Sequence, residues 1–357
     1  MSSLQLQTAK LPGNLEVAYF DSFASLAESD RPKEYTTVIG LHGTGFNSVG
    51  WAPIIPHLPP SIRFLAFNQR SYAGSSPAFE TKQPGAVDAT AQYVVDTMEF
   101  FNYAVEELGA KKKEEGGVVL MGWSKGNVLT ISLLSHLHAS SAPSPTSFAA
   151  YLPSSGLPHA SLIKTHLRAI LFYEPAGSAL GRPPTADLTN AMGSVFPPNT
   201  PTPEEFATAF AGWIGDYSPP TATSPEPTAS LPASGLAALP AELRSTVWEP
   251  DVVAHGFAWR ISPSPAEVQE LAKLGLAPEG ELAVPLGLFY GGRSVGYCMD
   301  ASAEIQRWWG VKEGGDKSGQ RKNTAVRRIE GTNHFGFLHE PEAFIKNMVE
   351  LIDELSQ

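Results

Sequence analysis

Short apolar runs alternate along the chain with amphipathic stretches that repeat at helical spacing. Helical spacing recurs over 91–108 and 128–137, and a closing helix is predicted over Pro341–Leu355. The short, continuous apolar runs are predicted to be strands: Leu15–Phe20, Thr36–Leu41, Arg63–Phe67, Val118–Met121, Ala169–Tyr173, Leu286–Tyr290 and Ala325–Ile329. Repetition of strand, helix and strand indicates an α/β fold with a mostly parallel, doubly wound sheet covered on both faces.

Two segments interrupt this alternation. Ser140–Pro158 is rich in Ser and Pro and is predicted to be an exposed excursion. Residues 176–283 contain a proline-rich stretch, which should stop regular structure, and also many aromatic residues: Phe206, Phe210, Trp213, Tyr217, Trp248, Phe257 and Trp259. Aromatic side chains that packed on nothing would be a solubility liability, so an inserted helical cap over a pocket is predicted. The alternative is a partly disordered linker between two domains.

The cap prediction divides the chain into three parts. Residues 1–175 are the first part of the core, residues 176–283 are the cap or lid insertion, and residues 284–357 complete the core. The last part is too short to make a convincing independent domain, which favours an insertion over two separate domains.

The charge balance of the chain argues against two classes of binding partner, nucleic acids and anionic membranes. Charged residues make up only 17% of the chain against 42% hydrophobic residues, which is typical of a compact enzyme. The 36 acidic residues outnumber the 25 basic ones, for a formal net charge of −11. Nucleic acids and anionic membranes require clusters of Lys and Arg, so neither is expected as a partner.

Cysteine usage and hydropathy indicate the compartment. The single cysteine, Cys298, excludes a disulfide within the chain, and no Cys and His residues have the local spacing of a zinc site, so no metal or cofactor is expected. The first ten residues lack the basic start and apolar core of a secretory signal, and no apolar run is long enough to span a membrane. A cytoplasmic protein is therefore expected; its oligomeric state is open, with a homodimer as one alternative.

The sequence Gly122-Trp123-Ser124-Lys125-Gly126 lies between the predicted strand that ends at Met121 and a predicted helix. The pattern G-x-S-x-G is weak alone, but between a strand and a helix it is typical of a nucleophile elbow. The sharp turn exposes the serine hydroxyl, while the glycines relieve crowding around the strained backbone. Ser124 is therefore the predicted nucleophile. The Lys125 side chain is expected to be exposed, with binding of an anionic substrate as the alternative.

A glycine-rich turn follows the neighbouring strand, with the sequence His42-Gly43-Thr44-Gly45. Backbone N–H groups in such a turn, together with the N–H of the residue after the nucleophile, can bind a developing oxyanion. The predicted donors are Thr44 and Lys125, with Gly43 as the adjacent alternative. A base at His42 would break the chain order expected for this elbow, so His42 is predicted to be structural.

His334 follows the last predicted strand, which is where the base belongs if the chain order is Ser, acid, His. The acid is harder to place. After the strand Leu286–Tyr290 the sequence has Ser294 where an aspartate is usual, and serine cannot stabilise an imidazolium by charge. Glu174, at the end of the preceding strand, is therefore the predicted acid, with Asp300 as the alternative.

These residues resemble the α/β-hydrolase fold. The resemblance covers the His42-Gly43 turn, the sequence Asn68–Ser75 after a strand, the elbow, and Gly331-x-x-His334 with the residues that follow it. The departures are Lys125 in the elbow, Ser294 in place of the acid, and the long cap. A glutamate one strand earlier is similar to the arrangement in fungal zearalenone lactonases, which open a macrocyclic lactone under a helical cap.

The resemblance and the candidate triad together imply a serine hydrolase. The expected reaction cleaves a carboxylic ester or lactone of an apolar small molecule through an acyl-enzyme, because the predicted cap is aromatic and carries few charges. Three alternatives stay open on the same fold: hydrolysis of a carbon–carbon bond, a biosynthetic acyltransferase or cyclase, and a ligand-binding protein without catalysis.

Overall fold

The computed structural model describes residues 5–77, 89–139, 157–183, 202–215, 236, 239–255, 265–278, 281–282, 284–311 and 319–356. The strands are β1 (Gln7–Leu11), β2 (Leu15–Asp21), β3 (Thr36–Leu41), β4 (Ile62–Phe67), β5 (Val118–Trp123), β6 (Leu167–Tyr173), β7 (Leu286–Gly291) and β8 (Thr324–Ile329). The α-helices are α1 (Ala89–Glu106), α2 (Gly126–Ala139), α3 (Ala160–His166), α5 (Pro203–Gly215), α6 (Ala241–Val247), α7 (Pro250–His255), α9 (Pro265–Leu276), α10 (Gly296–Trp308), α11 (Gly336–His339) and α12 (Pro341–Glu354). The 3-10 turns are η1 (Pro12–Asn14), η2 (Glu28–Asp30), η3 (Ser48–His57), η4 (Lys113–Glu115) and η6 (Gly177–Leu180).

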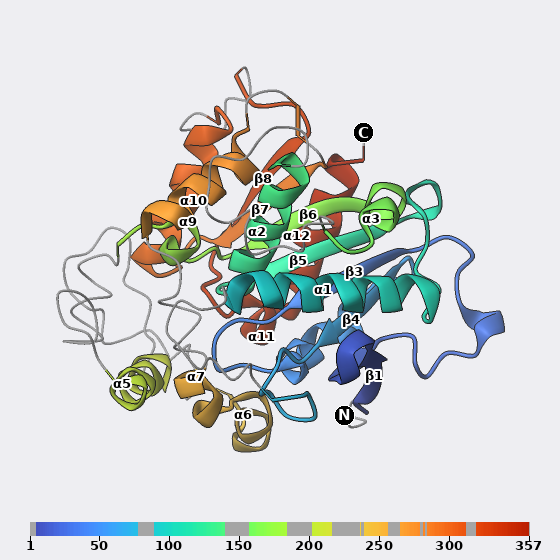
Figure 1. Cartoon of the computed structure of the whole chain (residues 1–357), viewed down its shortest axis with the longest axis horizontal. Helices are drawn as coiled ribbons and strands as arrows, with labels where there is room; N and C mark the ends of the chain where they lie inside the picture. Colours follow the sequence, from blue (N-terminus) through green and yellow to red (C-terminus); the bar gives the residue numbers. More distant parts are fainter. Residues whose placement is uncertain are drawn as a thin grey trace.

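All eight strands belong to one sheet, in the order β1-β2-β4-β3-β5-β6-β7-β8. The two pairings that involve β2 are antiparallel, and every pairing from β4 to β8 is parallel. The carboxyl ends of β3, β5, β6, β7 and β8 therefore meet at one edge of the sheet, where Figure 1 shows the connections to the helices. Segments that are far apart in the sequence meet at this edge.

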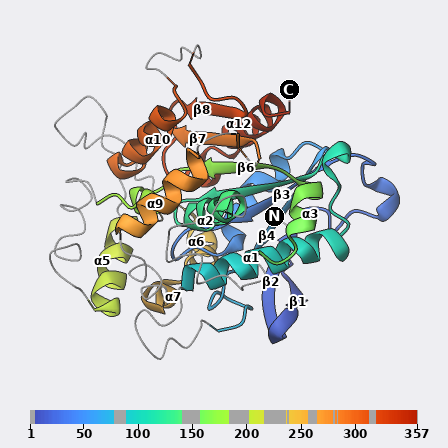
Figure 2. The same cartoon turned by 45° about the horizontal axis from the view of Figure 1, so that its top comes forward.

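Helices cover both faces of the sheet, and each face has its own buried cluster (Figures 1 and 2). Apolar residues of α1, α2, α9 and α10 make up one cluster, and those of η3, α11 and α12 contribute to the other. Strands β3 to β7 are almost entirely buried, in agreement with their largely apolar sequences. The predicted doubly wound α/β sheet is confirmed.

Each predicted strand is present, although several extend by one or two residues. The structure adds β1, whose sequence Gln-Thr-Ala-Lys-Leu buries only Ala9 and Leu11 and therefore has too weak a pattern to predict. The predicted excursion Ser140–Pro158 lies outside the described residues except at its last two positions. Within the described ranges, no helix is both long and apolar enough to cross a membrane.

In the described residues of the segment predicted as an insertion, 176–283, the α-helices fall into two groups. Helix α9 packs on the core helix α2, where the Ser135 hydroxyl donates a hydrogen bond of 2.6 Å to the Leu271 carbonyl oxygen. Helices α5, α6 and α7 lie below α9 in the view of Figure 1. We call these three helices the α5–α7 layer. Tyr217, Phe257 and Trp259 of the predicted cap lie outside the described residues.

A buried ion pair between Asp21 and Arg63 joins β2 and β4. Arg63 donates to both carboxylate oxygens of Asp21, at 2.9 and 2.5 Å, and to the carbonyl oxygen of Leu108 at 2.5 Å. The side chains of Arg63 and Asp21 are only 2% and 5% exposed. Asp21 also accepts from the Phe23 amide. Burial of a charge is tolerated here because nearly every polar atom of the pair has a partner.

Removing one member of this pair should destabilise the fold strongly. We expect Arg63→Met to lower the free energy of unfolding by about 3–5 kcal/mol, because the Asp21 charge is left buried and uncompensated. The matched control is Arg327→Met, since Arg327 pairs with the more exposed Glu350 and Glu354 and should lose at most about 1 kcal/mol. Urea unfolding followed by circular dichroism measures both; equal losses would contradict this account.

Candidate active site

Ser124 lies at the sharp turn between β5 and α2, in a strained left-handed conformation with φ of 52°. Its neighbours must be small. A Cβ atom on Gly122 would lie 2.8 Å from the Asn127 backbone, and one on Gly126 would lie 2.4 Å from the Leu41 carbonyl oxygen. A Cβ on Gly43 would lie 3.0 Å from that of Ser124, so the turn after β3 passes directly against the serine. Unlike its neighbours, Ser124 is partly exposed.

Glu174 follows β6 and is fully buried, also with a positive φ, of 49°. One carboxylate oxygen accepts a hydrogen bond of 2.6 Å from the Gly291 amide. The other accepts from the Ser294 hydroxyl and lies 3.3 Å from His334 Nδ1. Ser294, which stands where an aspartate was expected, therefore supports the carboxylate of the neighbouring strand. Asp300 lies exposed on α10, so the structure brings Glu174 to His334 instead.

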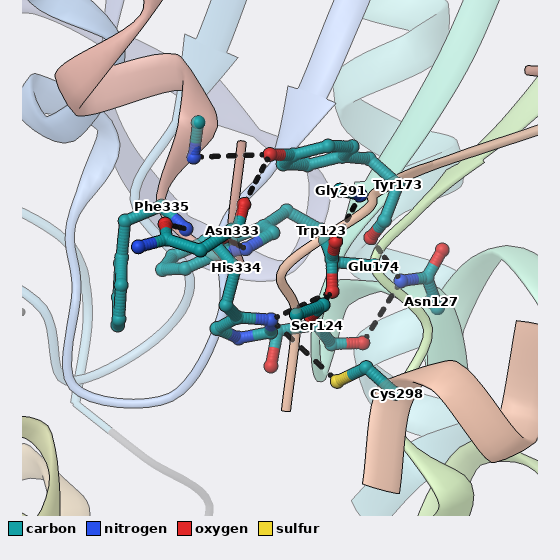
Figure 3. A network of polar contacts seen from close by, with 12 residues as sticks. Trp123, Ser124, Asn127, Tyr173, Glu174, Gly291, Cys298, Asn333, His334 and Phe335 are labelled. Carbon is teal, nitrogen blue, oxygen red and sulfur yellow. Dashed lines mark hydrogen bonds and ion pairs between the residues drawn. The ribbon is translucent and has the colours of Figure 1, made fainter. Parts of the chain in front are cut away.

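His334 lies on the loop between β8 and α11, and two aromatic residues hold this loop (Figure 3). Trp123, which precedes Ser124, donates from its indole to the His334 carbonyl oxygen at 3.0 Å. Tyr173, which precedes Glu174, donates its hydroxyl to the Asn333 carbonyl oxygen and accepts from the Gly336 amide. Burial and the nearby Glu174 raise the Tyr173 pKa well above its ordinary value, so the hydroxyl keeps its proton. Sequence analysis missed both roles.

The ring of His334 is oriented by Glu174. Nδ1 donates to the Glu174 carboxylate, since a carboxylate can only accept, and this leaves Nε2 as the atom able to take a proton. In Figure 3 the Ser124 side chain points toward the His334 ring. The Trp123 and His334 rings lie 5.3 Å apart, which fixes the ring plane. Glu174 and His334 are thus in contact at the carboxyl edge of the sheet, and Ser124 follows β5 at the same edge.

Cys298 also lies at this site, although no sequence pattern indicated it. The thiol is 2% exposed, and its Sγ lies 3.5 Å from His334 Nδ1, on the same side of the ring as Glu174. Cys298 belongs to the first turn of α10, which follows β7. A single cysteine carries no spacing signal, so only the fold could bring it to the site.

The turn after β3 contains the predicted oxyanion donors. Thr44 is partly exposed, and within the described ranges its amide has no protein acceptor, so this N–H is available to a ligand. His42 Nε2 accepts from the Gln69 amide at 3.0 Å, and Nδ1 donates to the Gly43 carbonyl oxygen. Burial lowers the His42 pKa to about 4, which keeps the ring neutral. Both nitrogens of His42 therefore hold the turn, in agreement with its predicted structural role.

The same turn is tied to the α5–α7 layer at the junction between α6 and α7. The Glu249 amide donates to the Gly45 carbonyl oxygen at 2.8 Å. The Glu249 carboxylate accepts from Asn47 Nδ2 at 2.7 Å and from the Ala73 amide at 2.9 Å. Asn47 also donates to the Thr246 carbonyl oxygen. One carboxylate therefore joins the turn, the loop after β4 and the α5–α7 layer.

Aromatic contacts continue from this junction to the elbow. Phe46 packs against Trp248 of the layer and against Trp123 of the elbow, with ring centroids 5.3 and 5.0 Å apart. Trp248 in turn stacks on Phe210 of α5 at 6.0 Å. A Cβ on Gly45 would lie 2.1 Å from Trp248, so this ring lies directly on the turn. The α5–α7 layer therefore packs beside the candidate site.

The burial of Lys125 differs from the prediction. Lys125 is only 7% exposed, so the prediction of an exposed elbow residue is wrong. The next residue, Gly126, packs closely against the turn after β3, and the sequence motif alone does not reveal how tightly this part of the elbow is packed. Its predicted role in the site concerns the backbone amide and is unaffected.

Comparison with known proteins shows the fold of the chain. No protein-family model and no curated protein matches it. It is similar to the crystal structure of a bromoperoxidase from Bacillus anthracis, with 13% identity, a TM-score of 0.52, and coverage of 98% of this chain and 100% of that chain. It is also similar to a membrane phospholipase A described as a bacterial virulence factor, with 16% identity, a TM-score of 0.53, and coverage of 99% and 86%.

A third similar structure belongs to novel epoxide hydrolases of the α/β-hydrolase superfamily from metagenomes of hot environments. Here the identity is 16% and the TM-score 0.53, with coverage of 98% of this chain and 99% of that chain. These three proteins carry different named activities, so their likeness concerns the scaffold and leaves the reaction to be argued from the site. The strand order and these similarities together show that this chain has the α/β-hydrolase fold.

Proposed function

We propose that this protein is a serine hydrolase that cleaves a carboxylic ester or lactone of an apolar small molecule through an acyl-enzyme. Ser124 Oγ attacks the carbonyl carbon while His334 Nε2 takes its proton. Glu174 stabilises the imidazolium that forms, and His334 then returns the proton to the leaving alcohol. A water molecule, activated by the same histidine, releases the acid and restores Ser124.

The observation that carries this proposal is the buried pairing of His334 Nδ1 with Glu174 at 3.3 Å beside a partly exposed serine. A nucleophile, a base and a group that orients the base are the minimum that acyl transfer requires. The amides of Thr44 and Lys125 are the proposed oxyanion donors, with Gly43 as the adjacent alternative. They flank Ser124, and the amide of Thr44 lacks a protein acceptor within the described ranges.

The proposed substrate is apolar because the α5–α7 layer, which we propose to be part of the cap, presents aromatic side chains next to the site. Phe206, Phe210 and Trp248 stack on one another in this layer. The buried glutamate at the end of β6 supports a lactone within this class, because its position is similar to that in fungal zearalenone lactonases. A lactone keeps alcohol and acid on one molecule, so its opening needs no route for a separate leaving group.

The experiment that tests this function combines covalent labelling with turnover. A fluorophosphonate should label wild-type protein at Ser124, found by peptide mass spectrometry, and p-nitrophenyl esters should be hydrolysed. A panel of aryl esters and macrocyclic lactones then ranks substrates. If folded protein is neither labelled nor active, the hydrolase proposal is wrong, and a ligand-binding protein without catalysis is the alternative that fits. Transfer to an added alcohol faster than to water would identify an acyltransferase, and cleavage of a β-diketone alone would identify a carbon–carbon hydrolase.

Removing the charge of Glu174 should reduce turnover without loss of the fold. We expect Glu174→Gln to lower kcat about 10³–10⁴-fold, because the imidazolium loses its counter-charge. The control is Asp300→Asn, which changes an exposed carboxylate on α10 and should keep nearly full activity. Circular dichroism reports whether each variant is folded. Near-normal turnover in Glu174→Gln would exclude this residue as the acid.

Removing the hydrogen bonds of the Glu249 carboxylate, which join the α5–α7 layer to the turn after β3, should lower kcat more than it changes KM. In Glu249→Ala the turn loses the carboxylate that Asn47 and Ala73 bind, and small displacements of oxyanion donors are costly, so kcat should fall about 10- to 100-fold. Steady-state kinetics measures both constants. The control is Glu242→Ala, an exposed residue of α6 in the same layer. Identical kinetics in the two variants would show that the link is purely structural.

A further inference from the structure

A cysteine, a histidine and a glutamate meet at the buried side of the proposed base. Glu174, Cys298 and His334 each offer one ligand atom, and these atoms lie within 4.8 Å of one another. All three residues are buried, with exposed fractions of 0%, 2% and 3%. They come from three elements: the end of β6, the first turn of α10, and the loop between β8 and α11 (Figure 3). Thiolate, imidazole and carboxylate together are a ligand set that suits Zn²⁺.

Two of the three distances between these atoms match the edges of a tetrahedral zinc site. Zinc bonds of about 2.0–2.1 Å to nitrogen, 2.0–2.2 Å to oxygen and 2.3 Å to sulfur give tetrahedral edges of about 3.3 Å for N···O and 3.5 Å for N···S. The structure has 3.3 Å between His334 Nδ1 and Glu174 Oε2, and 3.5 Å between His334 Nδ1 and Cys298 Sγ. We propose that Glu174, Cys298 and His334 bind one Zn²⁺ ion, which inhibits the enzyme reversibly.

The surrounding groups support each ligand. The Gly291 amide binds the carboxylate oxygen of Glu174 that is not a ligand, and the Ser294 hydroxyl binds the one that is. Hydrogen bonds of this kind orient ligands around a metal and raise its affinity. Cys298 lies in the first turn of a 13-residue helix, where the helix dipole stabilises a thiolate. A water molecule would complete the tetrahedron.

Inhibition follows from the proton balance, and this step rests on the proposed function. Zinc takes the Nδ1 lone pair, so the imidazole proton moves from Nδ1 to Nε2, and the Cys298 thiol loses its proton to solvent. One proton is released for each ion bound. His334 Nε2 then carries a hydrogen and cannot accept the proton of Ser124. The ion also takes the carboxylate oxygen that would have stabilised the imidazolium.

The burial of the cluster determines the kinetics of binding. The ligands are buried, so we expect the ion to enter when the surrounding chain moves, for example at the first turn of α10, where Gly296 and Tyr297 are partly exposed. Inhibition should therefore develop slowly after zinc is added and should reverse slowly after a chelator is added. The three ligands are distant in sequence, which is why no local spacing indicated a zinc site.

Cobalt titration of the full-length, chelator-treated protein tests the site without reference to activity. Because the chain has only one cysteine, a near-ultraviolet thiolate-to-cobalt charge-transfer band can arise only from Cys298. We expect this band to saturate at one Co²⁺ per chain and to disappear when Zn²⁺ is added. In Cys298→Ser the band should be absent, and zinc affinity, measured against a chromophoric chelator, should fall at least about 10-fold. The control Asp300→Asn, two residues along α10, should behave as wild type.

Ester hydrolysis is measured in parallel, with each variant compared with its own metal-free rate. Wild type and Asp300→Asn should lose activity slowly with zinc and recover with EDTA, whereas Cys298→Ser should resist. Folded wild type without a cobalt–thiolate band would overturn the metal site, whether or not the protein hydrolyses esters. The band without any hydrolysis would support the metal site and overturn the proposed function. Equal zinc inhibition of wild type and Cys298→Ser would overturn the link between this cluster and inhibition.

Discussion

The contact between Glu174 and His334 is the constraint on which the rest of the site depends. The acid lies at the end of β6 and the histidine follows β8, so β7 stands between them in the sheet. The turn after β7 bridges this separation, because Gly291 and Ser294 both bind the Glu174 carboxylate. An acid in the position of Ser294 would lie nearer to the loop of His334. In this protein the turn after β7 instead donates hydrogen bonds to Glu174, which follows the neighbouring strand β6.

The parallel strands position the site by their register. Ser124 follows β5 and binds the Tyr173 carbonyl oxygen through its amide, which aligns the nucleophile with the end of β6. Trp123 and Tyr173, each one residue before a proposed catalytic residue, then bind the loop of His334. Ser124 and Glu174 both have positive φ angles, which cost about 1–3 kcal/mol each. The fully buried strands behind them offset this strain.

Much of the core could be predicted from the sequence because its strands are buried on both faces and are therefore mostly apolar. The elbow was also predictable. Local crowding requires glycine at positions 122 and 126, so the motif has a fixed spacing around the serine that can be recognised in the sequence. Glu174 could be proposed because it directly follows a predicted strand. Each of these features is determined by residues that are close together in the sequence, so the sequence alone is enough to predict it.

Features that depend on distant residues left no such signal. Cys298 reaches His334 only because α10 starts beside the loop after β8, and Ser294 binds Glu174 across 120 residues of sequence. Glu249 binds Asn47 across 202 residues, and both have ordinary polar side chains that no motif marks. Lys125 is enclosed by packing between two turns, although its sequence position in an elbow suggested exposure. Long-range packing decides each of these cases.

The most direct test of the central claim is proton NMR of the metal-free protein in water. A proton shared between His334 Nδ1 and a buried carboxylate is shielded from solvent exchange and should give a resonance far downfield of the amide region. The account predicts this resonance in wild type and in Asp300→Asn, and its loss in His334→Ala and Glu174→Gln. A resonance that survives in Glu174→Gln but disappears in Asp300→Asn would contradict the account.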